Sequence, residues 1–554
     1  MPSREPVFSE SAECNVDPKR FAFTPRKLKI VCIGAGFSGL ILAHKLQHEQ
    51  PLDFVDFTIY EKNQEVGGTW FENIYPGVGC DVPAHSYVFP FEPNPFWSKC
   101  YAGGAEIEEY ILKTVEKWEL KKHVVLNTRL LGATWNEEHG KWKLKLEQDG
   151  AFLQDEADIL INGGGIQNRW KMPDIAGLDQ FKGKLLHTAA WDKTYDWTGK
   201  RIAVIGNGSS ALQVVPALQP KAAKIVNFIR QPTWVSVNLC PDVTKDGMGT
   251  NFEYTEEEKA KFRDDPEGFL EYRKMVERSV NTVYRLMLTG SEHNRGLLNA
   301  ISGLMQQRLN KSPHLIDKLI PKTEIGCRRL SPGDGYLESM QEPNADFCFD
   351  PIERITKTGI QTSQGEQHDF DLIVCATGFD STFIPAWNLV GRNGRQLTTD
   401  WKNTPQAYFS ICAGGAPNYF MFAGPNCPIG HGSVPQMLAW SADYMLQWVK
   451  KMGREDIQSV VVKDSAIHMY NRYAQANLKH TVWSTGCQAW YNNGSVVTAM
   501  YPGSVLHFKE AISTIRGEDF DIRYSNTVNP FAFLGNGELV WEREQGGDLA
   551  YYLK

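Results

Sequence analysis

Short apolar runs alternate with helically spaced apolar positions near the start of the chain. Residues 28–33 form an apolar run that ends in glycines, which predicts a buried strand. A helix is predicted over about 38–47, and residues 54–60, rich in Phe, Val, Thr and Ile, predict a second strand. A strand, a helix and a strand in this order open a doubly wound α/β fold.

The same order of elements recurs from Arg201. Residues 201–205 predict a strand, about 210–218 a helix and 224–229 the next strand, and a later strand is predicted over 372–376. Two such units in one chain predict an α/β protein with two Rossmann-like dinucleotide-binding domains. They also predict two nucleotide cofactors.

Between about residues 254 and 320 the pattern becomes helical. Thr255, followed by three glutamates, is a good helix start, and apolar residues then recur at helical spacing from Phe269 to Leu286. Such a stripe is typical of core packing. We therefore expect a helical insertion, at about 241–320, in the second nucleotide domain.

Composition narrows the class of protein. The 554 residues carry a net charge of -7, which argues against non-specific nucleic-acid binding. No run of about 18 uncharged apolar residues is present, so no membrane span is expected. The polar N-terminus lacks the apolar core of a signal peptide, which favours the cytoplasm.

The 11 cysteines include no C-x-x-C pair, and their spacings fit neither a zinc site nor a redox dithiol. We therefore expect no metal site, and we expect the cysteines to be reduced residues of the core. The missing dithiol also argues against disulfide-reductase flavoproteins.

The first glycine loop has the spacing G-x-G-x-x-G between a strand and a helix. Gly34 permits the tight turn, Gly36 lets the backbone approach a pyrophosphate, and Gly39 lets the helix and strand pack closely. Glu61, at the end of the second strand, can accept hydrogen bonds from ribose hydroxyls and would repel a 2′-phosphate. This loop is therefore predicted to bind FAD or NAD, and the following Gly67 and Gly68 suit a flat flavin ring.

The second glycine loop has different side chains around it. Its small residues are Gly206, Gly208 and Ala211, and its second strand is followed by Arg230 rather than by an acid. Because a guanidinium binds phosphate through charge-assisted hydrogen bonds, NADP is favoured over NAD here. Ser209, Ser210 and Gln213 lie at the start of the helix and are further candidate contacts.

Two longer stretches resemble signatures of one enzyme family. The segment from Phe181 to Asp192 is similar to the F-x-G-x-x-x-H-x-x-x-W-D fingerprint of type I Baeyer–Villiger monooxygenases, and the segment from Gly67 to Asp81 resembles a longer signature of the same family. The matching positions are Phe181, Gly183, His187, Trp191 and Asp192 in the first, and Gly67, Gly68, Trp70, Tyr75, Pro76, Gly77 and Asp81 in the second. The fungal branch is the nearest match.

This resemblance implies a domain organisation. An FAD-binding domain would be built from residues 28–175 and 381–554, an NADP-binding domain from 176–380, and residues 1–27 would form a tail or arm. The matching segment also makes Gly68, Thr69, Trp70 and Asp81 candidate cofactor-binding residues. His187 and Trp191 would link domain movement to cofactor binding, and a structural role for His187 is favoured.

The resemblance also implies the chemistry. Reduced FAD reacts with O2 to give a C4a-peroxide, which attacks a ketone while it stays anionic and yields an ester or lactone. Residues 326–330 resemble the family's G-x-K-R-L segment, so Arg329 is the candidate catalytic cation and Asp81 its partner; Arg328 stands where the family usually has a lysine that contacts NADP. Trp490 resembles the tryptophan of a mobile loop that contacts NADP and excludes water.

Alternatives remain open from the sequence. A flavin-containing monooxygenase that oxidises nitrogen or sulfur is the second hypothesis, although Trp191 and Arg329 argue against it. A redox sensor that binds both nucleotides without turnover is the third. The small-molecule ketone could be linear, cyclic or aryl.

Overall fold

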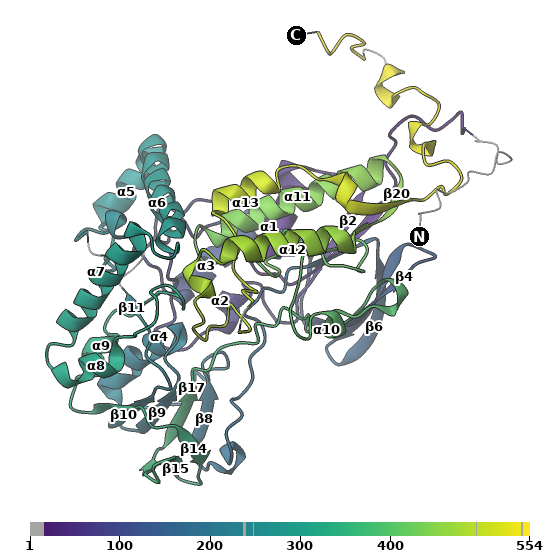
Figure 1. Ribbon diagram of the computed structural model, residues 1–554. Helices are drawn as coiled ribbons and strands as arrows, with labels where there is room; N and C mark the ends of the chain where they lie inside the picture. The colour runs from purple at the N-terminus through teal and green to yellow at the C-terminus, as the bar shows by residue number, and fades with distance from the viewer. Residues whose placement is uncertain (1–15, 237–239, 248, 495, 544–546, 554) are drawn as a thin grey trace.

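Two parallel sheets form the framework of the protein, as the computed structural model shows for residues 16–236, 240–247, 249–494, 496–543 and 547–553 (Figure 1). In the first sheet, every neighbouring pair of strands is parallel. Its order is β19 (Tyr419–Met421), β7 (Ile159–Asn162), β1 (Leu28–Ile33), β2 (Val55–Tyr60) and β3 (Val124–Val125). The strand β19 comes from late in the chain, so both ends of the sequence build this sheet.

The second sheet lies at the other end of the molecule and is also parallel throughout. Its order is β13 (Ala345–Cys348), β10 (Lys224–Phe228), β9 (Arg201–Ile205), β17 (Leu372–Cys375) and β8 (Lys184–His187). The central strands are continuous apolar runs that are buried on both faces, as parallel sheets require. The α/β fold with two nucleotide-binding units is therefore confirmed.

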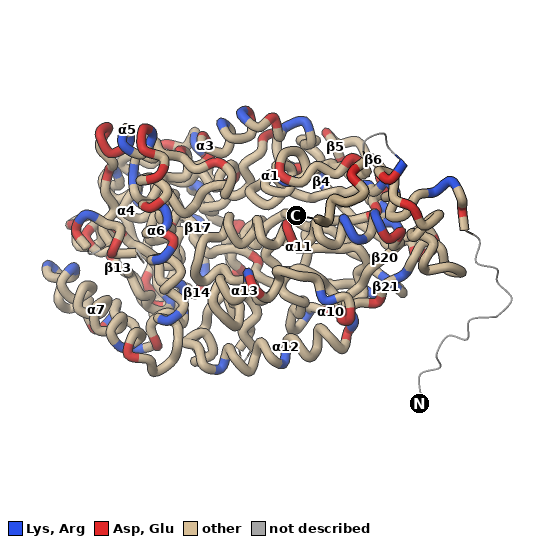
Figure 2. The backbone as a smooth tube through the Cα atoms, turned by 90° about the horizontal axis from the view of Figure 1, so that it is seen from above, with Lys and Arg blue, Asp and Glu red and all other residues tan. Residues whose placement is uncertain are grey.

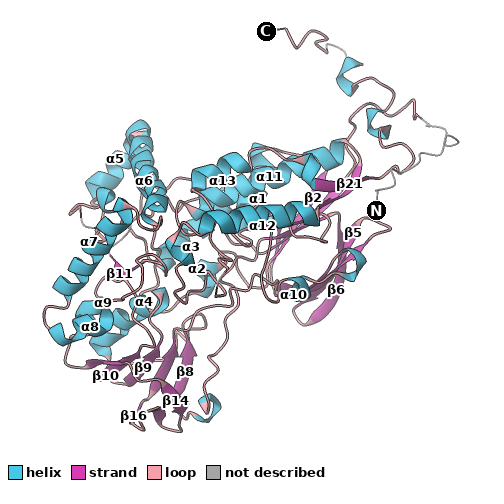
Figure 3. Cartoon of the chain, viewed as in Figure 1, coloured by secondary structure: helices cyan, strands magenta, loops and turns pink. Residues whose placement is uncertain are grey.

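Helices follow the strands in both units (Figure 3). α1 (Phe37–His44) packs against the long, mostly buried α11 (Val434–Arg454), and α4 (Ser209–Leu218) follows β9. Apart from α5, α6 and α7, which are described below, the other α-helices of the described residues are α2 (Thr69–Glu72), α3 (Gly104–Lys117), α8 (Ile316–Leu319), α9 (Tyr336–Ser339), α10 (Leu397–Asp400), α12 (Asp464–Leu478) and α13 (Val505–Ala511).

The expected helical insertion lies between β10 and β13. It consists mainly of α5 (Glu256–Asp264), α6 (Pro266–Leu286) and α7 (Glu292–Arg308), and these helices project from the second sheet (Figure 1). Thr255 caps α5 as predicted: its hydroxyl accepts the N–H of Glu258, and the Glu258 carboxylate accepts the N–H of Thr255. Figure 2 shows lysines and arginines beside acidic residues along α5.

Smaller sheets complete the molecule. One sheet joins β18 (Asn388–Val390), β4 (Thr128–Asn136), β5 (Lys141–Gln148) and β6 (Ala151–Ala157); the others are β14 (Ile352–Ile355) with β15 (Gly359–Thr362) and β16 (Gln367–Asp369), β20 (Ile457–Val462) with β21 (Phe520–Tyr524), and β11 (Val235–Ser236) with β12 (Ser331–Pro332). No helix within the described part of the chain is long and apolar enough to cross a membrane.

Residues 16–27, the described part of the predicted arm, pack against the C-terminal segment. The N–H groups of Ala22 and Phe23 donate to the carbonyls of Glu538 and Phe533, and Arg20 pairs with Asp456. The rest of the predicted arm lies outside the described residues.

The expectation that all cysteines are reduced is wrong for two of them. Cys327 and Cys487 form a disulfide with their Cα atoms 6.2 Å apart, across a sequence separation of 160. Neither spacing nor composition points to this pair, because only the fold brings the two loops together. The other described cysteines are free.

Candidate active site

The first glycine loop turns sharply between β1 and α1. Gly34 has φ +105°, and a Cβ there would lie 2.7 Å from the carbonyl oxygen of Gly163. A Cβ on Gly39 would lie 2.2 Å from the carbonyl oxygen of Gly34, so the helix can approach the loop only without a side chain. Both glycines are therefore required by the fold itself.

Gly36 and Gly68 bring two backbone segments together. A Cβ on Gly36 would lie 3.5 Å from the Gly68 Cα and 3.9 Å from the Gly68 nitrogen. No side chain caps the N-terminus of α1, so its first N–H groups stay available to an anion. Thr69 and Trp70 begin α2 directly after this contact, and Trp70 is buried with its indole N–H donating to Tyr87.

Glu61 lies buried beside the first glycine loop. Its carboxylate accepts the N–H of Ala35 at 2.8 Å and the N–H of Asn63 at 2.9 Å. Burial raises the pKa of the Glu61 carboxyl, while these two hydrogen bonds oppose the rise. The carboxylate is therefore fixed in orientation, and it retains lone pairs for a hydroxyl-bearing ligand.

The two glycines of the second loop differ in what the fold demands. Gly206 has φ +117°, and a Cβ there would lie 2.4 Å from the carbonyl oxygen of Ala376. Gly208 has an ordinary φ of -81°, and no described atom would lie within 4 Å of its Cβ. The fold requires Gly206, whereas Gly208 leaves open space at the uncapped start of α4.

Two arginines lie near each other on the second nucleotide unit. Arg230 follows β10, and Arg328 donates to the side chain of Gln231 at 2.7 Å. Neither arginine forms an ion pair with a carboxylate of the described chain. Burial and the charge of Arg230 lower the pKa of Arg328. Such uncompensated positive charge favours an anionic ligand.

Asp81 and Arg329 form a two-pronged ion pair across a sequence separation of 248. The Arg329 Nε and Nη2 atoms donate to the two carboxylate oxygens at 2.6 and 2.7 Å, and Nη1 donates to the carbonyl oxygen of Ile429 at 3.2 Å. The negative charge of Asp81 raises the pKa of Arg329, so the guanidinium stays charged. The sequence did not single out Ile429, because a backbone carbonyl leaves no trace in residue type.

The segment from Tyr75 to Asp81 also contacts the second unit. The Tyr75 hydroxyl donates to Gln213 at 2.6 Å, and Gln213 donates to the carbonyl oxygen of Gly79 at 3.0 Å. Ser209 shares a hydrogen bond with Ser331, at 2.6 Å. Gln213, proposed from sequence as a cofactor contact, thus joins the two nucleotide units in this structure.

Trp490 lines a cleft that is partly open to solvent. The cleft is also lined by Asn162, the last residue of β7, by Gly165, and by Asp380, which lies after β17. The next residue, Tyr491, is buried. It lies close enough to Arg329 for the guanidinium charge to oppose the rise in the pKa of the Tyr491 hydroxyl that burial causes. The Trp490 segment therefore connects this cleft with the surroundings of Arg328 and Arg329.

The fingerprint residues lie at the edge of the second sheet. A Cβ on Gly183 would lie 2.5 Å from the ring of Phe181. The Lys184 ammonium donates a hydrogen bond to the Asp192 carboxylate at 2.5 Å. His187 is buried, and its ring stacks on Trp170 with centroids 4.8 Å apart. Burial lowers the pKa of His187 to about 4, so the imidazole is neutral. Trp191 is also buried, so these contacts support packing rather than chemistry.

Comparisons with known proteins agree with this arrangement. Residues 27–262 match the family model described as flavin-binding monooxygenase-like. The FAD-binding monooxygenase tazF of Aspergillus terreus is 64% identical over 536 residues, covering 96% of this chain and 95% of the relative. A Baeyer-Villiger monooxygenase of Pseudomonas aeruginosa is 33% identical and covers 92% of this chain and 94% of its own.

Solved structures show the same fold. Cyclohexanone monooxygenase from Rhodococcus sp. Phi1, bound to NADP+, superposes with a TM-score of 0.78 and 25% identity, covering 90% of this chain and 100% of that chain. A closed crystal structure of cyclohexanone monooxygenase also gives a TM-score of 0.78, at 23% identity, over 91% of this chain and 100% of that chain. The chain belongs to the family of flavin-binding monooxygenases that includes the Baeyer–Villiger monooxygenases.

Proposed function

We propose that the protein uses FAD, NADPH and O2 to oxidise a ketone to an ester or lactone. The observation that carries this proposal is the two-pronged contact between Arg329 and Asp81. A guanidinium held in this way keeps its charge at every working pH. It can therefore stabilise the negative charge that develops on a carbonyl oxygen under nucleophilic attack.

The first nucleotide unit suits FAD. Gly36 and Gly68 lie close together and carry no side chain that would obstruct a ligand approaching the backbone. The uncapped start of α1 can receive a pyrophosphate. Glu61 offers a fixed carboxylate to ribose hydroxyls. We assign FAD to a domain of residues 28–175 and 381–554. When bound, reduced FAD would supply the activation of O2.

The second unit suits NADPH. Gly208 leaves open space that nothing in the described chain fills, which matches the approach of a pyrophosphate to α4. Arg230 and Arg328 supply positive charge without carboxylate partners among the described residues. Their pairing suits the 2′-phosphate that distinguishes NADPH from NADH. We assign this cofactor to residues 176–380.

Asp81 and Trp490 would support the chemistry of Arg329. Asp81 orients the guanidinium through two hydrogen bonds, so the charge is positioned before substrate arrives. Trp490, on the wall of the cleft, would exclude water when the cleft is filled. Ester formation would then compete better with the release of hydrogen peroxide.

The reaction can be tested by incubating the purified protein with FAD, NADPH and air. A panel of linear, cyclic and aryl ketones is supplied in one set of reactions and a tertiary amine in another. Ester or lactone, detected by gas chromatography, supports the proposal. Amine N-oxide without any ester would favour nitrogen oxidation instead, and a yellow protein that NADPH does not bleach would favour the sensor.

The role of Arg329 has its own test. In Arg329→Ala we expect NADPH still to bleach the flavin, while ester formation falls at least about 100-fold, as when a donor to a developing oxyanion is removed. Arg201→Ala is a matched control, because Arg201 pairs with Asp371 in the second sheet away from Asp81. Substantial ester from Arg329→Ala would contradict the assigned role.

A further inference from the structure

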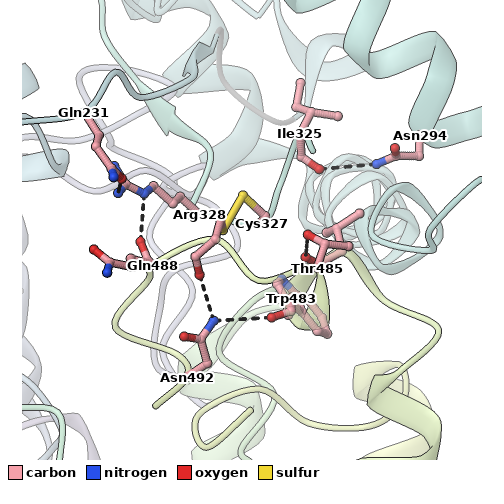
Figure 4. The surroundings of a disulfide bond; sticks show 11 residues. Gln231, Asn294, Ile325, Cys327, Arg328, Trp483, Thr485, Gln488 and Asn492 are labelled. Atoms are coloured by element: carbon pink, nitrogen blue, oxygen red, sulfur yellow. Dashed lines mark hydrogen bonds between the residues drawn. A yellow bond between two sulfur atoms is a disulfide. The ribbon is translucent and has the colours of Figure 1, made fainter. Parts of the chain in front are cut away.

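Two loops that carry proposed site residues are joined covalently. The arginine loop, residues 326–330, contains Cys327, and the Trp490 loop, residues 485–494, contains Cys487. Their sulfur atoms form the disulfide shown in Figure 4. Cys327 directly precedes Arg328 and Arg329, and Cys487 lies three positions before Trp490.

The two partners differ in exposure, which bears on their reactivity. Cys327 is buried, whereas Cys487 is only partly buried and stands between the exposed residues Gly486 and Gln488. A reductant can therefore reach the disulfide from the side of the Trp490 loop. Most free cysteines of the described chain are buried, and burial raises the pKa of the Cys32 and Cys412 thiols, which keeps them unreactive.

Few other bonds hold the two loops together. Within the described residues, one hydrogen bond joins them, from Arg328 Nε to the carbonyl oxygen of Gln488 at 2.9 Å. Asn492 bonds instead within its own part of the chain, to the carbonyls of Cys487 and Trp483 (Figure 4). The Trp490 loop also contains Gly486 and Gly494, both with positive φ and open space around them. The disulfide is therefore the strongest link between the loops.

We propose that the Cys327–Cys487 disulfide is a redox-controlled tether of the active site. In the oxidised protein it holds the Trp490 loop against the arginine loop. In the reduced protein the Trp490 loop can move away, which opens the cleft and speeds the release of NADP+. This inference rests on the proposed roles of Arg328, Arg329 and Trp490 in binding and closure.

The redox step balances as a thiol–disulfide exchange. Reduction transfers two electrons and two protons from a dithiol to the disulfide, giving two cysteine thiols and the oxidised dithiol. Formation joins the two Sγ atoms and releases two protons and two electrons. Hydrogen peroxide accepts these and becomes two water molecules, and peroxide is a by-product whenever a flavin monooxygenase runs uncoupled.

The first experiment does not depend on catalysis. Purified protein is treated with hydrogen peroxide or with dithiothreitol, unreacted thiols are alkylated, and tryptic peptides are analysed by mass spectrometry. We expect the peptides of Cys327 and Cys487 to be cross-linked after peroxide and separately alkylated after dithiothreitol. Absence of the cross-link under oxidising conditions would overturn the proposal.

A second readout follows the movement of the loop. Chymotrypsin cleavage after Trp490 is timed in both redox states, with fragments separated on reducing gels. Reduction should speed this cleavage, and the release of NADP+ from the protein, by at least about fivefold, the lower end of the range for coupled sites. Equal rates in the two states would overturn the proposal.

Variants separate the disulfide from other effects of the reagents. Cys487→Ser should show the fast rates of the reduced protein in both treatments, because its tether cannot form. Cys348→Ser is the matched control: it removes a free cysteine at the edge of the second sheet and should retain the full redox response. A Cys487→Ser protein that still responds to dithiothreitol would contradict the proposal, and the wild-type comparison stands even if a variant folds poorly.

The tether and the proposed reaction can fail separately. If cleavage and NADP+ release respond to redox state while no ketone gives an ester, the tether stands and the proposed reaction fails. If ester forms equally in both redox states and the rates do not change, the reaction stands and the tether is wrong.

Discussion

The two glycine loops share a backbone and differ in the charge around them. Both lie between a parallel strand and an uncapped helix, and Gly34 and Gly206 take the same left-handed turn, with φ +105° and +117°. The first loop has the buried carboxylate of Glu61 beside it, whereas the second has Arg230 and Arg328. This contrast underlies our proposal that the fold sets where a dinucleotide binds and that these charged side chains select which one.

The largest effect is expected within the second loop. Gly206→Ala places a Cβ near the Ala376 carbonyl in a strained conformation, which costs about 1–3 kcal/mol for the backbone alone. The midpoint of thermal unfolding, followed by circular dichroism, should fall by roughly 5 °C or more. Gly208→Ala should leave this midpoint almost unchanged and yet raise the KM for NADPH. If both variants unfold alike, the two glycines do not have separate roles.

The charge difference between the loops predicts the next effect. Arg230→Ala and Arg328→Ala each remove a charge-assisted contact worth about 1.5–3 kcal/mol, so the KM for NADPH should rise roughly 10- to 100-fold. The KM for NADH, measured by the same absorbance assay, should change little. Arg354→Ala, on the exposed strand β14, serves as the control. Equal changes for NADPH and NADH would remove the assignment of the 2′-phosphate site.

A smaller effect is expected at the first loop. Glu61→Gln keeps the shape of the side chain but loses its charge and one of its acceptor oxygens, so FAD affinity should fall about tenfold. The ratio of bound flavin to protein, read from the absorbance spectrum after dialysis, measures the change. Glu156→Gln, exposed on β6, should retain flavin fully. If Glu61→Gln retains as much bound flavin per protein as the wild type, the carboxylate does not select the ligand of the first loop.

The smallest effect concerns His187 at the edge of the second sheet. Its pKa is lowered to about 4 in the folded protein, whereas an unfolded histidine titrates near 6.5. Between these values the unfolded chain binds the extra proton, so the stability that neutral His187 contributes is lost as pH falls from about 6.5 to 4. The unfolding midpoint of His187→Gln should therefore approach that of wild type on acidification. Parallel curves would contradict this prediction.

Local patterns predicted much of the framework. The predicted bounds of β1 and β9 agree with the structure, and those of β2, β10 and β17 differ by one residue. The runs of β1 and β9 are mostly apolar and are followed directly by Gly34 and Gly206, so burial and backbone freedom coincide in the sequence there. The first helix was predicted as a single element, but a π-helix over Lys45–Glu49 follows α1. Residue types give no signal for such a change of hydrogen-bond register.

The candidate site was predictable where a signature names its residues. Asp81 and Arg329 were paired from family signatures, and the structure brings them together across 248 positions. The bond between Tyr75 and Gln213, and the disulfide, were missed, because each depends on how the two units pack. Long-range pairing of single residues leaves no periodic pattern that could reveal it.

The contact between the two ends of the described chain has a practical consequence. Residues 20–23 bond to the backbone of residues 533–538, on the side of the molecule away from α5, α6 and α7 (Figure 1). A reporter or an affinity surface coupled near either segment would therefore hold the molecule by the same end. The helical insertion would then point away from the surface. An enzyme that regenerates the nicotinamide cofactor could likewise be fused near residues 20–23 or 533–538 and would leave the second nucleotide unit unobstructed.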